Sequence, residues 1–239
     1  MDFGFHRGKY IQKDELGCRI TSIDGYNVYQ LIMDQHSRYT WIMFSKTKQP
    51  PFEFIKQFFQ HHGLTEGRRI VTTDNGGELH HSLTFRTVIL NAGYLMQCTA
   101  ADAPFQNGMA KRPNQTFGNM MRCLLHSSNL PSEYWSYDLI HAVRIKNTLP
   151  HSSTDQTPYL AYTGNHPTAE NLCIFGCRVY VHLPGERSHK LANHATYDTF
   201  LGYNATPKSI INIDNQTKKI KTATHVIFDE ANITLTADQ

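Results

Sequence analysis

Residues 24–41 read DGYNVYQLIMDQHSRYTW, and this stretch decides the fold of the first half of the chain. Two apolar runs, at 26–33 and 38–44, stand on either side of a polar break at 34–37. Runs of this length separated by a short polar break predict a β-hairpin. One face of such a hairpin must be covered, so the segments around it determine the fold class.

The segments after the hairpin alternate between helical and strand patterns. Phe54, Ile55, Phe58 and Phe59 are spaced as one helical face within 52–59. Further elements are expected as a strand at 69–73, a helix at 83–90, a strand at 94–99, a loop at 100–108 and a helix at 131–147. The longest helix follows the loop, and its predicted core stripe is Phe117, Met120, Met121, Leu124 and Leu125. This order predicts an α/β fold, a mixed sheet flanked by helices.

The composition changes after Gly164, where turn residues separate short apolar segments without a helical stripe. Strands are expected at 179–182, 199–203, 210–213, 219–222 and 226–228. Five short strands in about 55 residues predict a small β-barrel. We therefore predict a first domain at 1–164, a linker at 165–173, a barrel at 174–230 and a tail at 231–239.

The bulk composition is that of a globular protein. The chain has 239 residues, 40% of them apolar and 18% charged, with a formal net charge of +3. This weak positive charge permits nucleic-acid binding without arguing for it. Five cysteines, an odd number, argue against a disulfide framework. No segment resembles a membrane span or a signal core, so we expect a nuclear or cytoplasmic protein, not secreted, with no membrane partner and no small-molecule substrate.

Asp74 is the first candidate for chemistry. It follows a predicted strand and opens the turn at 75–77, where a carboxylate at a sheet edge is accessible to a divalent ion. Asp-Asn-Gly is also a common turn sequence, so Asp74 taken alone is a weak signal and a purely structural role is favoured at this point. Gln106 and Asn107 before the longest helix are likewise consistent with a helix N-cap.

Several motifs occur in one order along the chain. They are TTDNGGEL at 72–79, APFQNGMAKRPNQT at 103–116, LPSEYW at 130–135, IKNTLPH at 145–151, FGCRVYVH at 175–182 and FLGY at 200–203. Together with the hairpin, this set resembles the integrase of copia-type retrotransposon Pol polyproteins. The family pattern runs Asp-Asn-Gly-Gly-Glu, Pro-x-Gln-Asn-Gly-x-Ala-Glu-Arg, Trp-x-x-Ala, Asn-Arg-x-Pro, Phe-Gly-Cys and Val-Gly-Tyr. The ordered set covers nearly the whole chain, whereas any one motif alone is a weak signal.

The resemblance implies an RNase H-like core followed by an SH3-like barrel. It also implies DNA integration by phosphoryl transfer, with two Mg²⁺ or Mn²⁺ ions held by an Asp, Asp, Glu triad. The first Asp corresponds to Asp2 and the second to Asp74, while Asp34 falls in the hairpin turn, which the family does not use for catalysis. The implied partners are element-end and target DNA, and the family context allows a homo-oligomer.

Lys111 occupies the position of the triad glutamate, because Asn107, Gly108, Ala110 and Arg112 align around it. An ammonium there replaces an attraction for cations by a repulsion, and two unit charges about 4 Å apart interact by about 4 kcal/mol at an effective dielectric near 20. We therefore predict that the chain is inactive as an integrase. The alternative is that another carboxylate takes the place of the glutamate, and the candidates nearby in sequence are Glu78 and Asp102.

The same helix is expected to approach DNA, as it does in the family. The residues expected to bind nucleic acid are Gln106, Asn107, Lys111, Arg112, Gln115 and Arg122. A solvated helix face without a ligand is an equally consistent interpretation.

Other departures from the family pattern also favour a chain that is inactive as an integrase. Asp138 stands where the family has alanine, on a helix expected to be partly buried, and an unpaired carboxylate there is costly. Thr148 replaces an arginine and Leu201 a valine. Asp2 directly follows Met1, so we also predict that the first strand is truncated.

Two functions of different classes follow. The first is an integrase region that has lost catalysis at Lys111. The second is a non-catalytic nucleic-acid- or protein-binding module on the same scaffold, a decayed or host-recruited copy. An RNase H-type nuclease is disfavoured, because it needs more carboxylates than the chain offers and leaves the C-terminal motifs unexplained.

Overall fold

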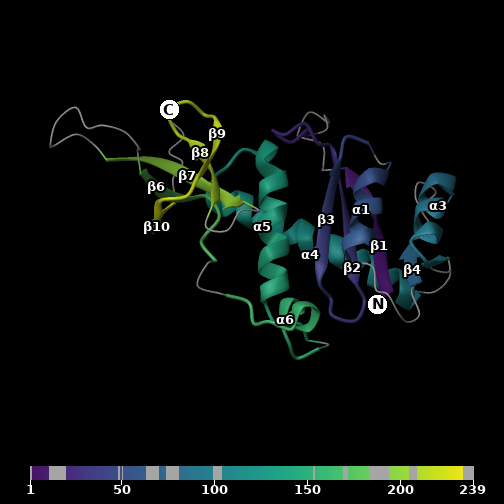
Figure 1. Cartoon of the computed structure of the whole chain (residues 1–239). Coiled ribbons are helices and arrows are strands. Elements are labelled where there is room, and N and C mark those ends of the chain that lie inside the picture. The colour runs from purple at the N-terminus through teal and green to yellow at the C-terminus, as the bar shows by residue number, and fades with distance from the viewer. Residues whose placement is uncertain are drawn as a thin grey trace. The chain divides into compact units, whose positions relative to one another are not determined.

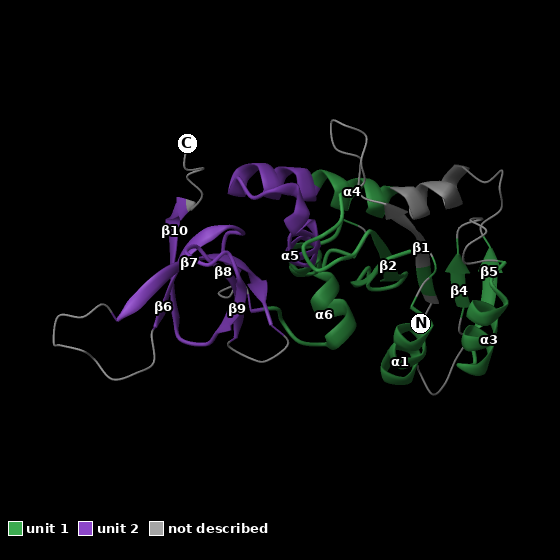
Figure 2. Ribbon diagram, turned by 90° about the horizontal axis from the view of Figure 1, so that it is seen from above, with its two compact units in different colours: residues 1–119, 143–167 green, residues 120–142, 168–239 purple. Residues whose placement is uncertain are grey.

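The chain forms two compact units, shown in different colours in Figure 2. The structure, a computed structural model, describes residues 2–10, 20–47, 49, 51–62, 70–73, 81–98, 104–152, 154–168, 172–182, 194–204 and 209–233. Unit 1 comprises Met1–Asn119 and Val143–Pro167, and unit 2 comprises Met120–Ala142 and Thr168–Gln239. This grouping differs from the domain limits at 164 and 174, which stay predictions.

Unit 1 is built on a five-stranded mixed sheet in the order β3-β2-β1-β4-β5. Its strands are β1 (Asp2–Tyr10), β2 (Val28–Asp34), β3 (Thr40–Ser45), β4 (Ile70–Thr73) and β5 (Leu95–Cys98) (Figure 1). The central strand β1 pairs antiparallel with β2 and parallel with β4. β1 has nine residues and begins at Asp2, and the truncation of the first strand stays a prediction. Its glycines and polar residues obscure the alternation of a strand, and pairing on both sides overrides that weak local preference.

The predicted hairpin is confirmed. β2 and β3 pair from Val28 opposite Ser45 to Met33 opposite Thr40. Asp34 closes the turn: its Oδ2 accepts hydrogen bonds from the backbone N–H of Ser37 at 2.9 Å and from its hydroxyl at 2.5 Å. The carboxylate that sequence analysis placed in the turn is therefore a structural residue of that turn.

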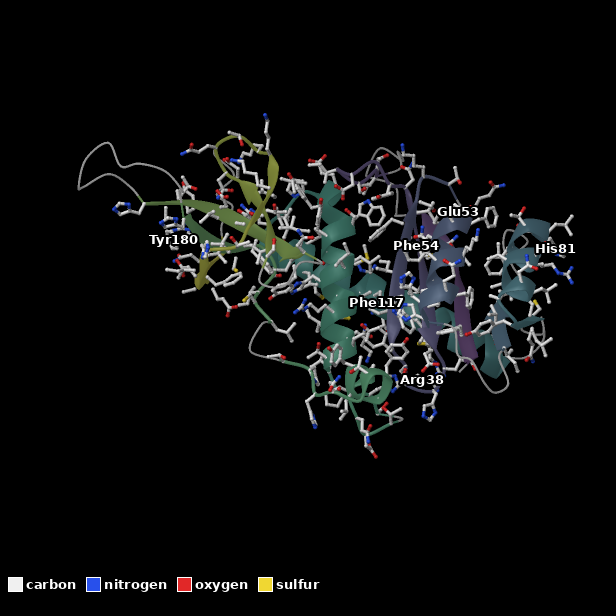
Figure 3. The ribbon with its side chains drawn as sticks, in the orientation of Figure 1. Arg38, Glu53, Phe54, His81, Phe117 and Tyr180 are labelled. Atoms are coloured by element: carbon white, nitrogen blue, oxygen red, sulfur yellow. The ribbon has the colours of Figure 1, made fainter. Side chains whose placement is uncertain are left out.

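Two helices contribute to one hydrophobic core on the sheet, α1 (Phe52–His62) and α3 (Leu83–Asn91). The fully buried Phe3 of β1 lies in this core, with its ring centroid 5.3 Å from that of Phe58 and 5.8 Å from that of Trp41. Phe54 was expected on the same helical face but is exposed, since it lies one residue outside the stripe of Ile55, Phe58 and Phe59 (Figure 3). The core thus joins β1, the hairpin and both helices.

The longest helix, α4 (Pro104–Ser128), begins earlier than predicted. The predicted loop at 100–108 is wrong from residue 104 on, because Pro104 starts the helix and proline is favoured in the first helical turn. Gln106 and Asn107 therefore lie inside the helix rather than at its N-cap. Of the predicted core stripe, Phe117 and Met121 are buried, and the remaining members are partly buried.

The predicted helix at 131–147 is a 3-10 turn, η1 (Ser132–Tyr134), followed by α5 (Trp135–Thr148). Within unit 1, the end of α5 is tied to the hairpin by Asn147. Its Oδ1 accepts from the N–H of Thr40 and its Nδ2 donates to the carbonyl of Thr40, both at 2.9 Å. The buried amide thus satisfies both backbone groups of the first residue of β3.

A short helix absent from the sequence prediction, α6 (Pro158–Thr163), packs on the hairpin side of unit 1. Thr157 caps its N-terminus and Gly164 ends it in the left-handed conformation, at φ +74°. Tyr162 lies with its ring centroid 4.9 Å from those of Tyr39 and Trp41, and its hydroxyl is 2.7 Å from Nδ1 of His62. Burial, with smaller contributions from nearby acidic groups, raises the pKa of Tyr162 to about 12. These contacts hold α6 in place.

Unit 2 contains an antiparallel sheet in the order β10-β6-β7-β8-β9. Its strands are β6 (Cys177–His182), β7 (Ala195–Tyr203), β8 (Ile210–Asp214), β9 (Ile220–Ala223) and β10 (Val226–Ile233). All five predicted strands are present, and β7 and β10 are longer than predicted. No described helix in either unit is long and apolar enough to cross a membrane.

Two hydrophobic clusters hold unit 2 together. One lies between strands of the sheet and includes Cys177, Val179, Phe200 and Ile210. The other joins the sheet to the helical segment of the same unit, with Leu201 and Ile213 against Leu124, Leu125, Leu130 and Tyr134. The end of α4 and the chain after it are therefore part of the second unit's core.

Gly176 allows the sheet to approach the end of α4. A Cβ at this position would lie 2.3 Å from the Cβ of Ser128, the last residue of α4, and the backbone of Gly176 has φ +79°. Both the contact and the conformation require glycine. The Phe-Gly-Cys motif is thus explained by packing.

Asp138 is a buried carboxyl group of α5 in unit 2. It is fully buried, and neither of its oxygens has a hydrogen-bond partner among the described residues. Desolvation raises its pKa to about 9, so the folded chain keeps this group protonated at neutral pH. The expected cost of a carboxyl group at this position is borne out by its burial.

Gly176→Ala should destabilise the chain by at least about 2 kcal/mol, because a Cβ meets Ser128 and adds strain at positive φ. Ser128→Gly in the same chain should recover part of the loss by removing the opposing Cβ. Urea denaturation of the natural chain, both single variants and the double variant measures the coupling. Additive effects of the two substitutions would contradict the close contact.

Stability should fall as the pH rises, because the pKa of Asp138 is higher in the folded chain than in the unfolded one. Protonated Asp138 makes its full contribution to the free energy of unfolding below about pH 4. Between there and about pH 9 the free energy of unfolding falls by about 1.4 kcal/mol per pH unit. Asp138→Asn should flatten this dependence, whereas Glu133→Gln, an exposed acid in η1, should not. Urea midpoints at several pH values between about 5 and 8.5 check the slope, and equal slopes for Asp138→Asn and the natural chain would refute the assignment.

Candidate functional site

Asp2 is the first residue of β1, the central strand of the first sheet. In the parallel pairing of β1 with β4 it lies at one end, and Thr73, which Asp74 follows in the sequence, lies at the other. Asp2 is opposite Ile70 in the parallel pair, whereas Phe5 is opposite Thr73, the last residue of β4. Three strand residues span on the order of 10 Å. The register therefore does not place Asp2 beside the strand end after which Asp74 comes. Asp74 itself, with Glu78 and Asp102, lies outside the described residues.

Among the residues that the structure describes, the donor set does not fit a two-metal centre. Such a centre needs carboxylates clustered around ions about 4 Å apart. The register of β1 separates Asp2 from the end of β4, and the third position is occupied by Lys111. Within the described part of the chain, no group of three or more His, Cys, Asp or Glu side chains could hold a metal ion.

The two cysteines closest in sequence serve packing. Cys177 is buried in the sheet cluster, with Cys173 packed against it, and both are free thiols. Burial raises the pKa of Cys177 to about 12, which disfavours the thiolate that a metal requires.

The predicted nucleic-acid contacts all lie on α4. Arg112, Gln115 and Arg122 are exposed. Gln106, Asn107 and Lys111 belong to the same helix, and their side chains are outside the described set. The 25 residues of α4 include three Lys or Arg and no Asp or Glu. The helix is therefore a positively charged element.

Sequence analysis missed a polar contact on the first sheet, between the turn after β2 and strand β4. Gln35 donates from Nε2 to Oγ1 of Thr72 at 3.2 Å. Gln35 directly follows β2 and Thr72 belongs to β4, and β1 lies between these two strands in the sheet. Gly4 of β1 is the residue opposite Thr72.

The sequence comparisons extend over nearly the whole chain. Residues 177–238 match the family model of the retroviral polymerase SH3-like domain. The chain is 31% identical over 228 residues to the retrovirus-related Pol polyprotein from transposon RE2 of Arabidopsis thaliana, covering 93% of this chain and 15% of that protein. It is 28% identical over 225 residues to that from transposon TNT 1-94 of Nicotiana tabacum, covering 92% and 17%. The chain thus spans about a sixth of the length of the relatives it matches.

A solved structure is similar in fold. A chain of the simian T-cell lymphotropic virus intasome, in complex with the PP2A regulatory subunit B56 gamma, matches with a TM-score of 0.52 and 15% identity. The match covers 93% of this chain and 75% of that chain. Residues 177–238 therefore match the retroviral polymerase SH3-like domain, and nearly the whole chain is similar to one part of Pol polyproteins from copia-type transposons.

Proposed function

We propose that this chain is an integrase region that binds DNA through α4 and does not catalyse integration. The observation that carries the proposal is Lys111, a cation on α4 at the place of the family's triad glutamate. The same substitution removes a metal ligand and adds a group that attracts phosphate.

Electrostatics of α4 supports DNA binding. Its three Lys or Arg residues stand without any Asp or Glu in the helix, while the whole chain has a formal net charge of only +3. Arg112 and Gln115 are exposed in unit 1, so a phosphate can reach them. Arginine and glutamine side chains commonly contact DNA phosphates and fix the protein on the duplex without reading its sequence.

Chemistry of phosphoryl transfer supports the loss of catalysis. The reaction depends mainly on positioned metal ions that neutralise developing negative charge. Repulsion by Lys111 opposes an ion at the third ligand position, and the register of Asp2 keeps it away from the end of β4. Both points support the absence of a donor set for those ions among the described residues, and no step of the reaction is assigned to them.

Arg112→Ala should weaken binding to a short DNA duplex and reduce the salt dependence of that binding by about one unit of slope, because one phosphate contact is lost. Arg86→Ala, an exposed arginine on α3 of the same unit, is the matched control and should leave both unchanged. Fluorescence anisotropy across a salt series measures affinity and slope. Equal effects of the two substitutions would reject α4 as the DNA contact, and no duplex binding at all would favour a protein-binding module.

The natural chain should show no strand transfer with Mg²⁺ or Mn²⁺, because the third ligand position is cationic. Lys111→Glu should increase Mn²⁺ binding, measured by calorimetry, even if it does not restore turnover. Lys111→Gln is the control that removes the charge without adding a ligand, and it should gain less. Strand transfer by the natural chain that Asp74→Asn abolishes would refute the loss of catalysis, and no gain with Lys111→Glu would refute the role given to position 111.

A further inference from the structure

Three large exposed side chains form one row across the sheet of unit 2. Tyr180 of β6 is opposite Ile227 of β10 on one side and opposite Tyr197 of β7 on the other. Their exposed fractions are 37% for Tyr180, 72% for Ile227 and 51% for Tyr197. Residues directly opposite on adjacent strands point to the same face, so these three side chains, here named the tyrosine row, form one surface, and Tyr180 in its middle is labelled in Figure 3.

The tyrosine row is the uncovered part of a face that is otherwise packed. Thr199, two residues after Tyr197 and hence on the same face, is opposite Ile213, and Ile213 is opposite Ile220. Ile213 and Ile220 pack with residues of the helical segment of unit 2. The face is therefore covered over β8, β9 and the end of β7, where Thr199 and Leu201 are fully buried, and it is open at the three residues of the tyrosine row.

Polar groups border the tyrosine row on both sides. On one side Arg178, two residues before Tyr180, lies with its guanidinium carbon 5.1 Å from the ring centroid of Tyr197. On the other side His182 and His225 are exposed and adjacent, since the N–H of His182 donates to the carbonyl of His225 at 3.1 Å. The cation over the ring of Tyr197 restricts that ring and adds positive charge next to it.

We propose that the tyrosine row is a stacking platform for unpaired bases of single-stranded nucleic acid. Adjacent strands lie about 4.8 Å apart, so the row offers two neighbouring aromatic rings, Tyr180 and Tyr197, with the apolar side chain of Ile227 beside them. Exposed aromatic rings on a sheet, next to a cation, stack bases without regard to sequence. Bases inside a duplex are already stacked on one another and cannot use the platform.

The size of the row favours bases over a second protein molecule. A stable protein interface buries about 800 Å² on each partner. Three side chains, two of them about half exposed or less, provide much less than this. Planar bases need only the area of a ring, which each tyrosine supplies.

The inference extends the proposed function from duplex to single-stranded nucleic acid and uses a different unit. The α4 contact acts through phosphates, whereas the tyrosine row acts through bases. Variants of one surface leave the other unchanged, so each proposal can fail without the other.

The test is anisotropy of the full chain with a fluorescein-labelled oligothymidylate of about 12 nucleotides and an abasic oligomer of equal length. The natural chain should prefer the oligothymidylate. Tyr180→Ala and Tyr197→Ala should each weaken its binding about tenfold and leave abasic binding unchanged. Tyr180→Phe and Tyr197→Phe keep the ring and should retain affinity, and Leu83→Ala, an exposed apolar residue of α3, is the control.

Three results would overturn the inference. The natural chain could bind both oligomers equally, or the alanine variants could bind oligothymidylate as the natural chain does. A dimer in sedimentation that Tyr180→Ala dissociates, without base-dependent binding, would assign the row to a second copy of the chain. Failure of Arg112→Ala to affect duplex binding, with base-dependent binding intact, would reject only the α4 proposal.

Discussion

The pairing of β1 with strands on both sides is the constraint on which unit 1 depends. β1 joins the antiparallel hairpin to the parallel strands β4 and β5, and no other strand of that sheet contacts both groups. Its Phe3 fills the core between the sheet and α1. Without β1 the hairpin and the parallel pair would be separate small sheets, each too small to be stable alone. The strand also carries Asp2, so its register decides what that residue can do.

Sequence patterns predicted the elements whose own residues define them. The hairpin, α1 and the strands of unit 2 have clear apolar periodicity, and the structure contains them. The extent of β1 was not predicted, because Gly4, Gly8 and its polar residues do not alternate with apolar residues as in a typical strand. Its pairing with two neighbouring strands is what makes it a strand. α6 was not predicted, because six residues are too few to show the apolar periodicity of a helix. Thr157, Pro158 and Gly164 were nevertheless signals for its two ends. The place of Lys111 on a helix was predictable, whereas the register separating Asp2 from the end of β4 is a property of pairing.

The motifs that carry the family resemblance are largely packing requirements. Gly176 permits the approach to Ser128, Asn147 satisfies the backbone of Thr40, and Trp135 is fully buried. Such residues keep their role whether or not the chain catalyses a reaction. The motifs therefore identify the architecture independently of activity. Asp138 is the exception, a departure inside the core that has an energetic cost.

The two proposed contacts differ in their physical basis. Phosphate contacts on α4 release counterions and weaken as salt rises, whereas stacking on the tyrosine row depends on contact between flat apolar surfaces and changes little with salt. The glutamate of the family would repel phosphate unless metal ions neutralise it, so replacing it by lysine removes the need for those ions in binding. A chain with Lys111 can thus hold nucleic acid under conditions in which a metal-dependent relative without ions would bind it less well. In the proposed function, loss of catalysis and gain of metal-independent binding are two consequences of one change of charge.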